Sequence, residues 1–167
     1  MLIAIMTRQR VLKNKPLPKG FKRLIMRSPL LLYRLGLGWV MGGRFLRLRH
    51  RGRKSAHVHD TVLEVAGYDQ GTGTYYVASG WGEGSHWFRN IQKTPGVGVQ
   101  VASRKFQAKA ERLPEKEGAE ILFRYAKKYP KAFGILTDKM LGEKLEPTEE
   151  NAARMSKYVP VAALKPI

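Results

Sequence analysis

Polar and apolar residues alternate along several short stretches of the chain. In residues 44–50, Leu46 and Leu48 share one face while Arg47 and Arg49 share the other, which is the period of a half-buried strand. The remaining strands are predicted over residues 60–69, 74–80, 97–103, 105–113 and 159–166. The glycine-rich "QGTG" and the pair "SR" each join two of these stretches, so the pattern predicts antiparallel hairpins.

Helical periodicity fills the intervals between the strands. The spacing of Ile121, Leu122 and Tyr125 is amphipathic, with acidic residues in the first turns of the segment and lysines in the last. Ser85 and Pro95 bound a short helix as its N-cap and its stop signal. The other helices are predicted over residues 21–41, 114–129, 131–141 and 148–158.

Five or six antiparallel strands with helices between them predict a mainly β domain with flanking helices, in the α+β class. A small closed barrel is the expected architecture, because closure leaves no edge strand exposed. With 167 residues the chain is long enough for one domain with a buried core. We expect residues 1–20 to form a basic N-terminal arm and residues 21–167 to form the single domain.

Positive charge is concentrated at the front of the chain. The residues before Asp60 hold 15 of the 31 Lys and Arg and none of the 13 Asp and Glu. Such a field attracts nucleic acid, anionic lipid headgroups or phosphorylated and polycarboxylate small molecules, and its sign cannot choose among them. The absence of cysteine excludes disulfides, thiolate catalysis and zinc–thiolate sites.

No membrane-spanning segment is predicted. The opening "MLIAIM" is too short for a signal peptide, and the apolar run around Arg34 falls short of the roughly 20 residues that a bilayer needs. Packing as a core helix is the favoured interpretation of that run, with a helix lying on an anionic surface as the alternative. We therefore expect a cytoplasmic protein whose basic front segment can dock on the inner face of the membrane.

The turn after the first strand concentrates groups that bind phosphate. Gly52 lies between Arg51 and Arg53 and is followed by Lys54 and Ser55. Backbone N–H groups, guanidinium forks, an ammonium and a hydroxyl are the donors that phosphate sites use. A strand-end turn also carries solvated charges without any function, so composition favours the two interpretations equally, with nonspecific polyanion contact as a third.

Aromatic residues and glycines cluster in the stretch "ASGWGEGSHWFRN". Flat side chains and closely approaching backbone suit a pocket wall. For Trp87 and Phe88, packing on the inward face of a short helix is the favoured interpretation. For Ser79, Gly80 and Trp81, lining a pocket and packing are equally favoured. No metal site is predicted from the four histidines.

The order of these pieces resembles the deazaflavin-dependent nitroreductase family, a split β-barrel class related to the flavin-binding pyridoxine phosphate oxidases. The likeness runs from Leu30 to Tyr129 and depends on "GRKS" followed by "HWFRNIQKTPG". These stretches match the pattern G-R-K-[ST] with a later W-[YF]-x-N-[LI]-x-x-x-P, which is specific only as a combination. The resemblance implies an antiparallel split barrel like that of pyridoxine phosphate oxidase.

The resemblance also implies an oxidoreductase that uses coenzyme F-420, a deazaflavin with a phosphodiester and a polyglutamate tail; FMN is the alternative coenzyme. By resemblance, Arg53, Lys54 and Ser55 hold the phosphate and the nearby tail. The residues implied to border the ring system and the substrate space are Ser79, Gly80, Trp81, His86, Trp87 and Phe88. Arg89 and Asn90 also match the motif, with a structural role as one interpretation.

Departures from the family pattern fall just after the turn. Where the family commonly has G-x-P-R, this chain has Ala56, Val58 and His59. The family arginine is a permanent cation, whereas His59 can replace it only when protonated. Arg49 and Arg51 are nearby cations that can compensate.

The leading functional hypothesis is hydride transfer from reduced F-420 to an activated small-molecule acceptor, such as a nitro compound, a quinone or an enone. Water, Tyr125 or Tyr129 is the candidate proton donor. A non-catalytic flavin-like or lipid ligand-binding protein docked on a membrane is the alternative. A nucleic-acid-binding protein ranks third, because no RNP-like aromatic strand is present. Assembly as a homodimer is left open.

Overall fold

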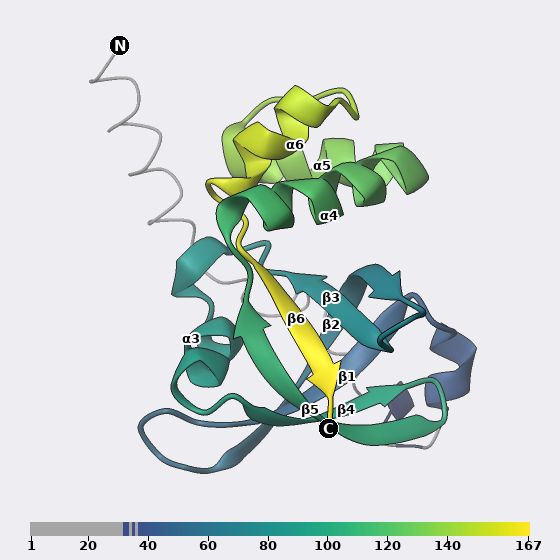
Figure 1. The fold of residues 1–167 in the computed structure, drawn as a ribbon, viewed down its shortest axis with the longest axis vertical. Helices are drawn as coiled ribbons and strands as arrows, with labels where there is room; N and C mark the ends of the chain where they lie inside the picture. The colour runs from purple at the N-terminus through teal and green to yellow at the C-terminus, as the bar shows by residue number, and fades with distance from the viewer. Residues whose placement is uncertain (1–31, 34, 36) are drawn as a thin grey trace.

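The structure, a computed structural model, describes residues 32, 33, 35 and 37–167 (Figure 1). Six strands form a closed barrel in the order β1-β2-β3-β6-β5-β4, with β4 returning to β1. Every neighbouring pair is antiparallel. The strands are β1 (Phe45–Arg51), β2 (Val58–Asp69), β3 (Thr74–Ala78), β4 (Gly96–Val101), β5 (Arg104–Arg112) and β6 (Val161–Pro166). The predicted α+β barrel is confirmed.

The helices occupy two places around the barrel. Figure 1 shows α4, α5 and α6 gathered at one end of the molecule, while α3 lies beside the barrel near the loop between β1 and β2. The helices are η1 (Gly38–Met41), η2 (Gly82–Gly84), α3 (His86–Lys93), α4 (Glu115–Lys128), α5 (Pro130–Leu141) and α6 (Glu149–Ser156). The short helix after Ser85 and the three helices predicted beyond residue 113 are confirmed.

Alternation along the strands fills the barrel interior. Leu46 and Leu48 of β1 are fully buried in one core cluster, while Arg47 and Arg49 lie on the opposite side of the strand. Phe88 and Ile91 project from α3 into the same cluster. Burying each such side chain contributes about 1.5–3 kcal/mol relative to exposure. This packing holds α3 against the barrel, which matters because α3 carries part of the candidate site.

A second core lies between the barrel and the helical layer. Strand β6 is buried on both faces, so it lacks the polar alternation of β1. Ala162 and Leu164 belong to the barrel interior, whereas Val161 and Ala163 pack with the residues of α4, α5 and α6. Burial on both faces explains why "VAAL" reads as a continuous apolar run.

The front of the chain is only partly described by the structure. The arm over residues 1–20 and most of the helix over residues 21–41 lie outside the described residues. At the end of that segment the structure has a four-residue 3-10 helix, η1, in place of a final α-helical turn. It ends at Gly42, whose φ of 57° is in the left-handed region that glycine adopts without strain.

One turn differs in register from its prediction. The loop between β4 and β5 consists of Ala102 and Ser103, one residue earlier than the predicted "SR" pair. Ala102 takes a positive φ of 49° there. Within the described part of the chain, no helix is long and apolar enough to cross a membrane.

Candidate functional site

A cavity of about 990 Å³ opens between the β1–β2 turn, the η2–α3 segment and the residues after α6. Pockets of about 300–1,000 Å³ commonly hold cofactor-sized ligands. The structure brings several of the sequence-predicted site residues together around this one cavity. They are Arg53, Lys54, Ser55, His59, Trp81, His86 and Trp87. The two segments singled out in the sequence therefore form opposite parts of one site.

The β1–β2 turn is tightly closed on itself. Gly52 donates its N–H to the His57 carbonyl at 2.8 Å, and Ala56 donates to the Gly52 carbonyl at 2.9 Å. A Cβ at Gly52 would lie 2.8 Å from Ser55 Oγ and 2.9 Å from His59 Nε2, so only glycine fits there without a shift. Ala56 adopts a φ of 57°, which accounts physically for the glycine that the family commonly has at this position.

Helix α3 fixes this turn in place. Asn90 Oδ1 accepts hydrogen bonds from the backbone N–H of Arg53 at 3.1 Å and from Arg53 Nη1 at 3.2 Å. Lys93 Nζ donates to the Arg53 carbonyl at 3.2 Å. Within the part of the chain that the structure describes, the N–H groups of Lys54 and Ser55 make no hydrogen bond. They are available to an anion beside the cationic side chains.

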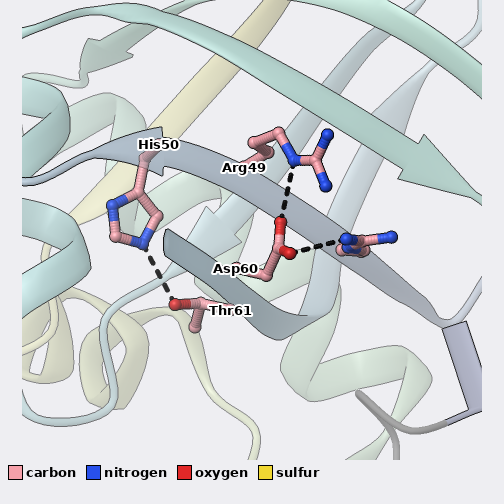
Figure 2. Close-up of polar contacts among 5 residues, drawn as sticks. Arg49, His50, Asp60 and Thr61 are labelled. Carbon is pink, nitrogen blue, oxygen red and sulfur yellow. Dashed lines mark hydrogen bonds and ion pairs between the residues drawn. The ribbon is translucent and has the colours of Figure 1, made fainter. Parts of the chain in front are cut away.

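Beneath the turn, His50 and Asn90 are buried polar residues joined by hydrogen bonds. His50 is 4% exposed and Asn90 is 5% exposed. Asn90 Nδ2 and His50 Nδ1 are 3.1 Å apart. The other ring nitrogen, Nε2, lies 3.1 Å from Thr61 Oγ1, and Figure 2 marks this hydrogen bond. Burial, with a smaller contribution from the neighbouring His59, lowers the pKa of His50 to about 4 against the opposing effect of Asp60. The His50 ring is therefore neutral at pH 7.

Sequence reasoning missed His50 and Thr61. It considered His50 only as a metal ligand, and among the described residues no group of three or more metal-ligating side chains occurs. The available signal was the alternation of β1, which places His50 on the same inward face as Leu46 and Leu48. A polar side chain on an apolar face needs a hydrogen-bond partner, and here Asn90 supplies it.

Asp60 is the acidic residue at the rim of the cavity nearest the turn. It pairs with Arg47 Nη2 at 2.5 Å and with Arg49 Nε at 3.1 Å (Figure 2). Partial burial works to raise the pKa of Asp60, but the hydrogen bonds and charges of the two arginines outweigh it and hold the pKa below its ordinary value. Two cations therefore neutralise this carboxylate, so it does not repel an anionic ligand.

The aromatic side of the cavity combines packing and exposure. Phe88 is fully buried and Trp87 is 8% exposed, with their rings in an edge-to-face arrangement at 5.4 Å. The favoured packing interpretation of these two residues agrees with their burial, although Trp87 also lines the cavity. Trp81 is 38% exposed and lines the cavity, where its indole is available for stacking.

Other predicted residues lie away from the cavity surface. Ser79 is fully buried and donates from Oγ to the Gly82 carbonyl at 2.7 Å. It also shares a hydrogen bond with Ser85 Oγ at 2.5 Å, so it shapes the loop that carries Trp81. Gly80 lines a different cavity beside α5. Arg51 is exposed at the end of β1 and does not line the main cavity.

Tyr125 and Tyr129 are not brought together with the turn. Both line a separate cavity of about 560 Å³ between α4 and strands β2 and β3. Arg44 stacks on the Tyr129 ring at 4.8 Å. Burial, aided by the nearby Glu64 carboxylate, raises the pKa of Tyr125. These tyrosines therefore face a different space from the β1–β2 turn.

Comparison with solved structures relates the fold to known proteins. A structure of an F420-H2 dependent reductase (FDR-A) superposes with a TM-score of 0.51 and 19% identity, over 73% of this chain and 94% of its own. A protein of unknown function from Agrobacterium tumefaciens gives a TM-score of 0.53 and 15% identity, over 90% of this chain and 58% of its own. At these identities the likeness shows the fold alone.

A Clostridium acetobutylicum protein of the pyridoxine phosphate oxidase family gives a TM-score of 0.48 and 8% identity, over 81% of this chain and 84% of its own. A search of curated proteins found no match. The closed antiparallel barrel with its bordering cavity defines a split-barrel protein. More particularly, the model of the F420H(2)-dependent quinone reductase family matches residues 34–141, and the chain belongs to that family of oxidoreductases. The resemblance stated from the sequence is confirmed.

Proposed function

We propose that the protein binds the deazaflavin coenzyme F-420 in the main cavity and that hydride passes from the reduced coenzyme to a small activated acceptor. The main support for the proposal is that one cavity of about 990 Å³ is lined on one side by the hydrogen-bond donors of the β1–β2 turn and on another by Trp81 and Trp87. A coenzyme with a flat ring system, a phosphodiester and several carboxylates needs both kinds of surface. Family membership supports the same coenzyme class.

The donor set at the turn fits a phosphodiester. Arg53 and Lys54 supply permanent cations, and Ser55 supplies a hydroxyl. The N–H groups of Lys54 and Ser55, which make no hydrogen bond among the described residues, add two neutral donors. His59 borders the same cavity in place of the family arginine and adds a further cation only when protonated. The permanent cations suffice for a single phosphodiester charge, so the loss of the arginine is compatible with binding.

The aromatic side would hold the ring system. Trp81 offers an exposed face for stacking, while Trp87 closes the cavity over the barrel core. When bound, the coenzyme supplies the hydride chemistry. The residues of this chain contribute binding, orientation and exclusion of water, which together account for a large part of the rate enhancement in such reactions.

The acceptor is proposed to be a quinone, a nitro compound or an enone. Each accepts hydride at an electron-poor atom and then needs one proton. Tyr125 and Tyr129 were the candidate protein donors, but they line the separate cavity beside α4. Burial also raises the pKa of Tyr125, which makes its proton less available. Water is therefore the proposed proton source.

The proposal is tested by titrating the purified protein with oxidised F-420 and, in parallel, with FMN while coenzyme fluorescence is followed. Saturable quenching by F-420 at micromolar concentration, with weaker or no response to FMN, is the expected result. Stopped-flow mixing of the reduced complex with menadione should then reoxidise the coenzyme. Absence of saturable binding by F-420 would overturn the proposal.

The same experiments discriminate the other hypotheses. Saturable binding without reoxidation by any acceptor class would indicate a ligand-binding protein. Nucleic acid that stays bound to the protein through a high-salt wash would favour the hypothesis of a nucleic-acid-binding protein. Docking on a membrane depends on residues 1–20, which lie outside the described residues, and sedimentation with anionic liposomes with and without that segment tests it. Homodimer formation is measured by light scattering.

A further inference from the structure

Thr61 is a cavity-lining residue that neither the phosphate turn nor the aromatic wall includes. It lies on β2 opposite Leu48 of β1, and its side chain borders the main cavity. Its hydroxyl has one partner among the described residues, Nε2 of the buried His50 at 3.1 Å (Figure 2). A hydroxyl can donate one hydrogen bond and accept two. The role of Thr61 therefore depends on whether His50 donates or accepts in this contact.

The direction of the contact follows from Asn90. Its Oδ1 accepts from two donors, the backbone N–H and the Nη1 of Arg53, so the orientation of the amide is fixed. The Nδ2 group, which can only donate, therefore faces His50 Nδ1 at 3.1 Å. His50 Nδ1 must accept this hydrogen bond and cannot carry a proton. A neutral imidazole without a proton on Nδ1 carries it on Nε2.

His50 consequently donates from Nε2–H to Thr61 Oγ1. The hydroxyl proton of Thr61 cannot point back at His50, because that position is filled by a donor. No other acceptor within the part of the chain that the structure describes takes this proton. The Thr61 hydroxyl is left as a donor at the wall of the cavity, where Thr61 is partly exposed. A ligand that presents an acceptor there can take this proton in place of solvent.

We infer that Thr61 donates a hydrogen bond to an acceptor atom of the bound ligand, such as a ring carbonyl oxygen, and that His50 is the positioning residue that fixes this direction. The inference rests on the proposed function for the identity of the ligand, since the deazaflavin ring system carries carbonyl acceptors. The inference gives the Asn90 carboxamide two roles. Its oxygen holds Arg53 of the β1–β2 turn, and its NH₂ group sets the His50 tautomer that leaves Thr61 as a donor.

The first experiment compares coenzyme binding by matched variants of the full chain. T61S keeps the hydroxyl, whereas T61V keeps the shape and removes it. Fluorescence titration with oxidised F-420 should give T61S an affinity within about twofold of the wild type and T61V an affinity about tenfold weaker, the size of one lost hydrogen bond. Circular dichroism confirms that both variants are folded. Equal affinities for T61V and the wild type would overturn the inference while leaving the proposed function intact.

A double-mutant cycle separates positioning by His50 from a general structural role. H50F removes both ring nitrogens at similar size, and it should weaken binding in the wild-type background but cause no further loss in the T61V background. If H50F weakens F-420 binding equally in both backgrounds, His50 acts through the β1–β2 turn and does not position Thr61. If H50F does not fold, the T61S and T61V pair still decides the ligand contact.

The tautomer is testable without any coenzyme. Long-range proton–nitrogen correlation spectra of the free wild-type protein should show His50 protonated at Nε2 and unprotonated at Nδ1. The opposite tautomer, or an imidazolium at pH 7, would overturn the inference. A wild-type protein that fails to bind F-420 overturns the proposed function and the ligand contact together, and in that case the spectra still test the hydrogen-bond direction.

Discussion

Asn90 of α3 donates from Nδ2 to Nδ1 of His50 on β1 at 3.1 Å, and both side chains are almost completely buried. The other end of the same carboxamide accepts from Arg53 in the β1–β2 turn. A single side chain thus couples the geometry of the turn to the protonation state of a buried histidine. This coupling makes the site sensitive to substitutions that preserve its shape but exchange donors for acceptors.

Replacing Asn90 by Asp should raise the pKa of His50. The carboxylate would still accept from Arg53, but its second oxygen would face His50 Nδ1, which can satisfy that oxygen only by carrying a proton. A neighbouring opposite charge shifts a pKa by roughly 1–3 units. The His50 ring signals in an NMR titration should therefore move upward from the wild-type value of about 4. N151D makes the same chemical change on α6, where Asn151 does not contact His50, and should leave the pKa of His50 unaffected. An unchanged pKa of His50 in N90D would contradict the prediction.

The stability of the protein should fall between about pH 6.5 and pH 4. Burial lowers the pKa of His50 from 6.5 to about 4, so over this window the unfolded chain binds a proton that the folded chain does not. The free energy of unfolding therefore decreases as the pH falls, by roughly 3 kcal/mol in all. The groups facing His50 are the stacked His59 ring and Asp60. The pKa of Asp60 is held below its ordinary value of 3.8, so the stability that Asp60 contributes is lost only at lower pH. The loss caused by His50 is therefore seen separately, at higher pH.

Urea unfolding at several pH values measures this dependence. The variant H50Q has no titratable group at that position, so its stability should change much less than that of the wild type over the same window. Its absolute stability is not the readout, because only the difference in pH slope reports the proton uptake. Parallel slopes for the two proteins would show that another group dominates.

Lys54 and His57 form a matched pair for testing the phosphate site. Both are exposed residues of the same turn region, but only Lys54 lines the cavity. K54A should weaken F-420 binding by about 1–3 kcal/mol, the range for a charged hydrogen-bonding partner, whereas H57A should have a smaller effect. Added salt should reduce the difference. Equal and negligible effects in the fluorescence titration would mean that the turn carries only solvated charge.

Replacing Ala56 by Gly should stabilise the protein. Ala56 is exposed and has a φ of 57°, a conformation that costs roughly 1–2 kcal/mol for a residue with a Cβ. Glycine relieves that strain, but its greater freedom in the unfolded chain costs roughly 0.4–1 kcal/mol of stability. The free energy of unfolding should therefore rise by about 0.5–1 kcal/mol, measured by thermal or urea unfolding. A56V should instead lose stability, because a β-branched residue tolerates positive φ poorly. A loss in A56G would show that the backbone relaxes around alanine.

Most strands and helices could be predicted because their signals are local. The alternation of Leu46 and Leu48 with Arg47 and Arg49 marks β1 wherever that strand lies in the fold. The β4–β5 turn was placed one residue late, since alternation alone does not reveal that Ala102 adopts the positive φ. In the candidate site, the seven predicted residues that share the cavity belong to two continuous stretches, each recognisable by its own composition.

The contacts between those stretches could not be predicted. His50 and Thr61 meet because β1 and β2 pair in one particular register, and Asn90 reaches His50 because α3 packs against the barrel. Tyr125 was judged only by its position on a helix. The tertiary structure places that helix over β2 and β3, so its tyrosine faces a separate cavity.

By itself, the sequence determined the class of fold, the order of its elements, the family, and the two segments that border the cavity. These properties follow from periodicity, turn chemistry and short motifs, which neighbouring residues define. Only the tertiary structure decided which side chains converge on the cavity, which histidine is neutral and which hydroxyl is left as a donor. Hydrogen-bond direction and burial depend on strand register and helix packing, and these bring together residues far apart in the chain.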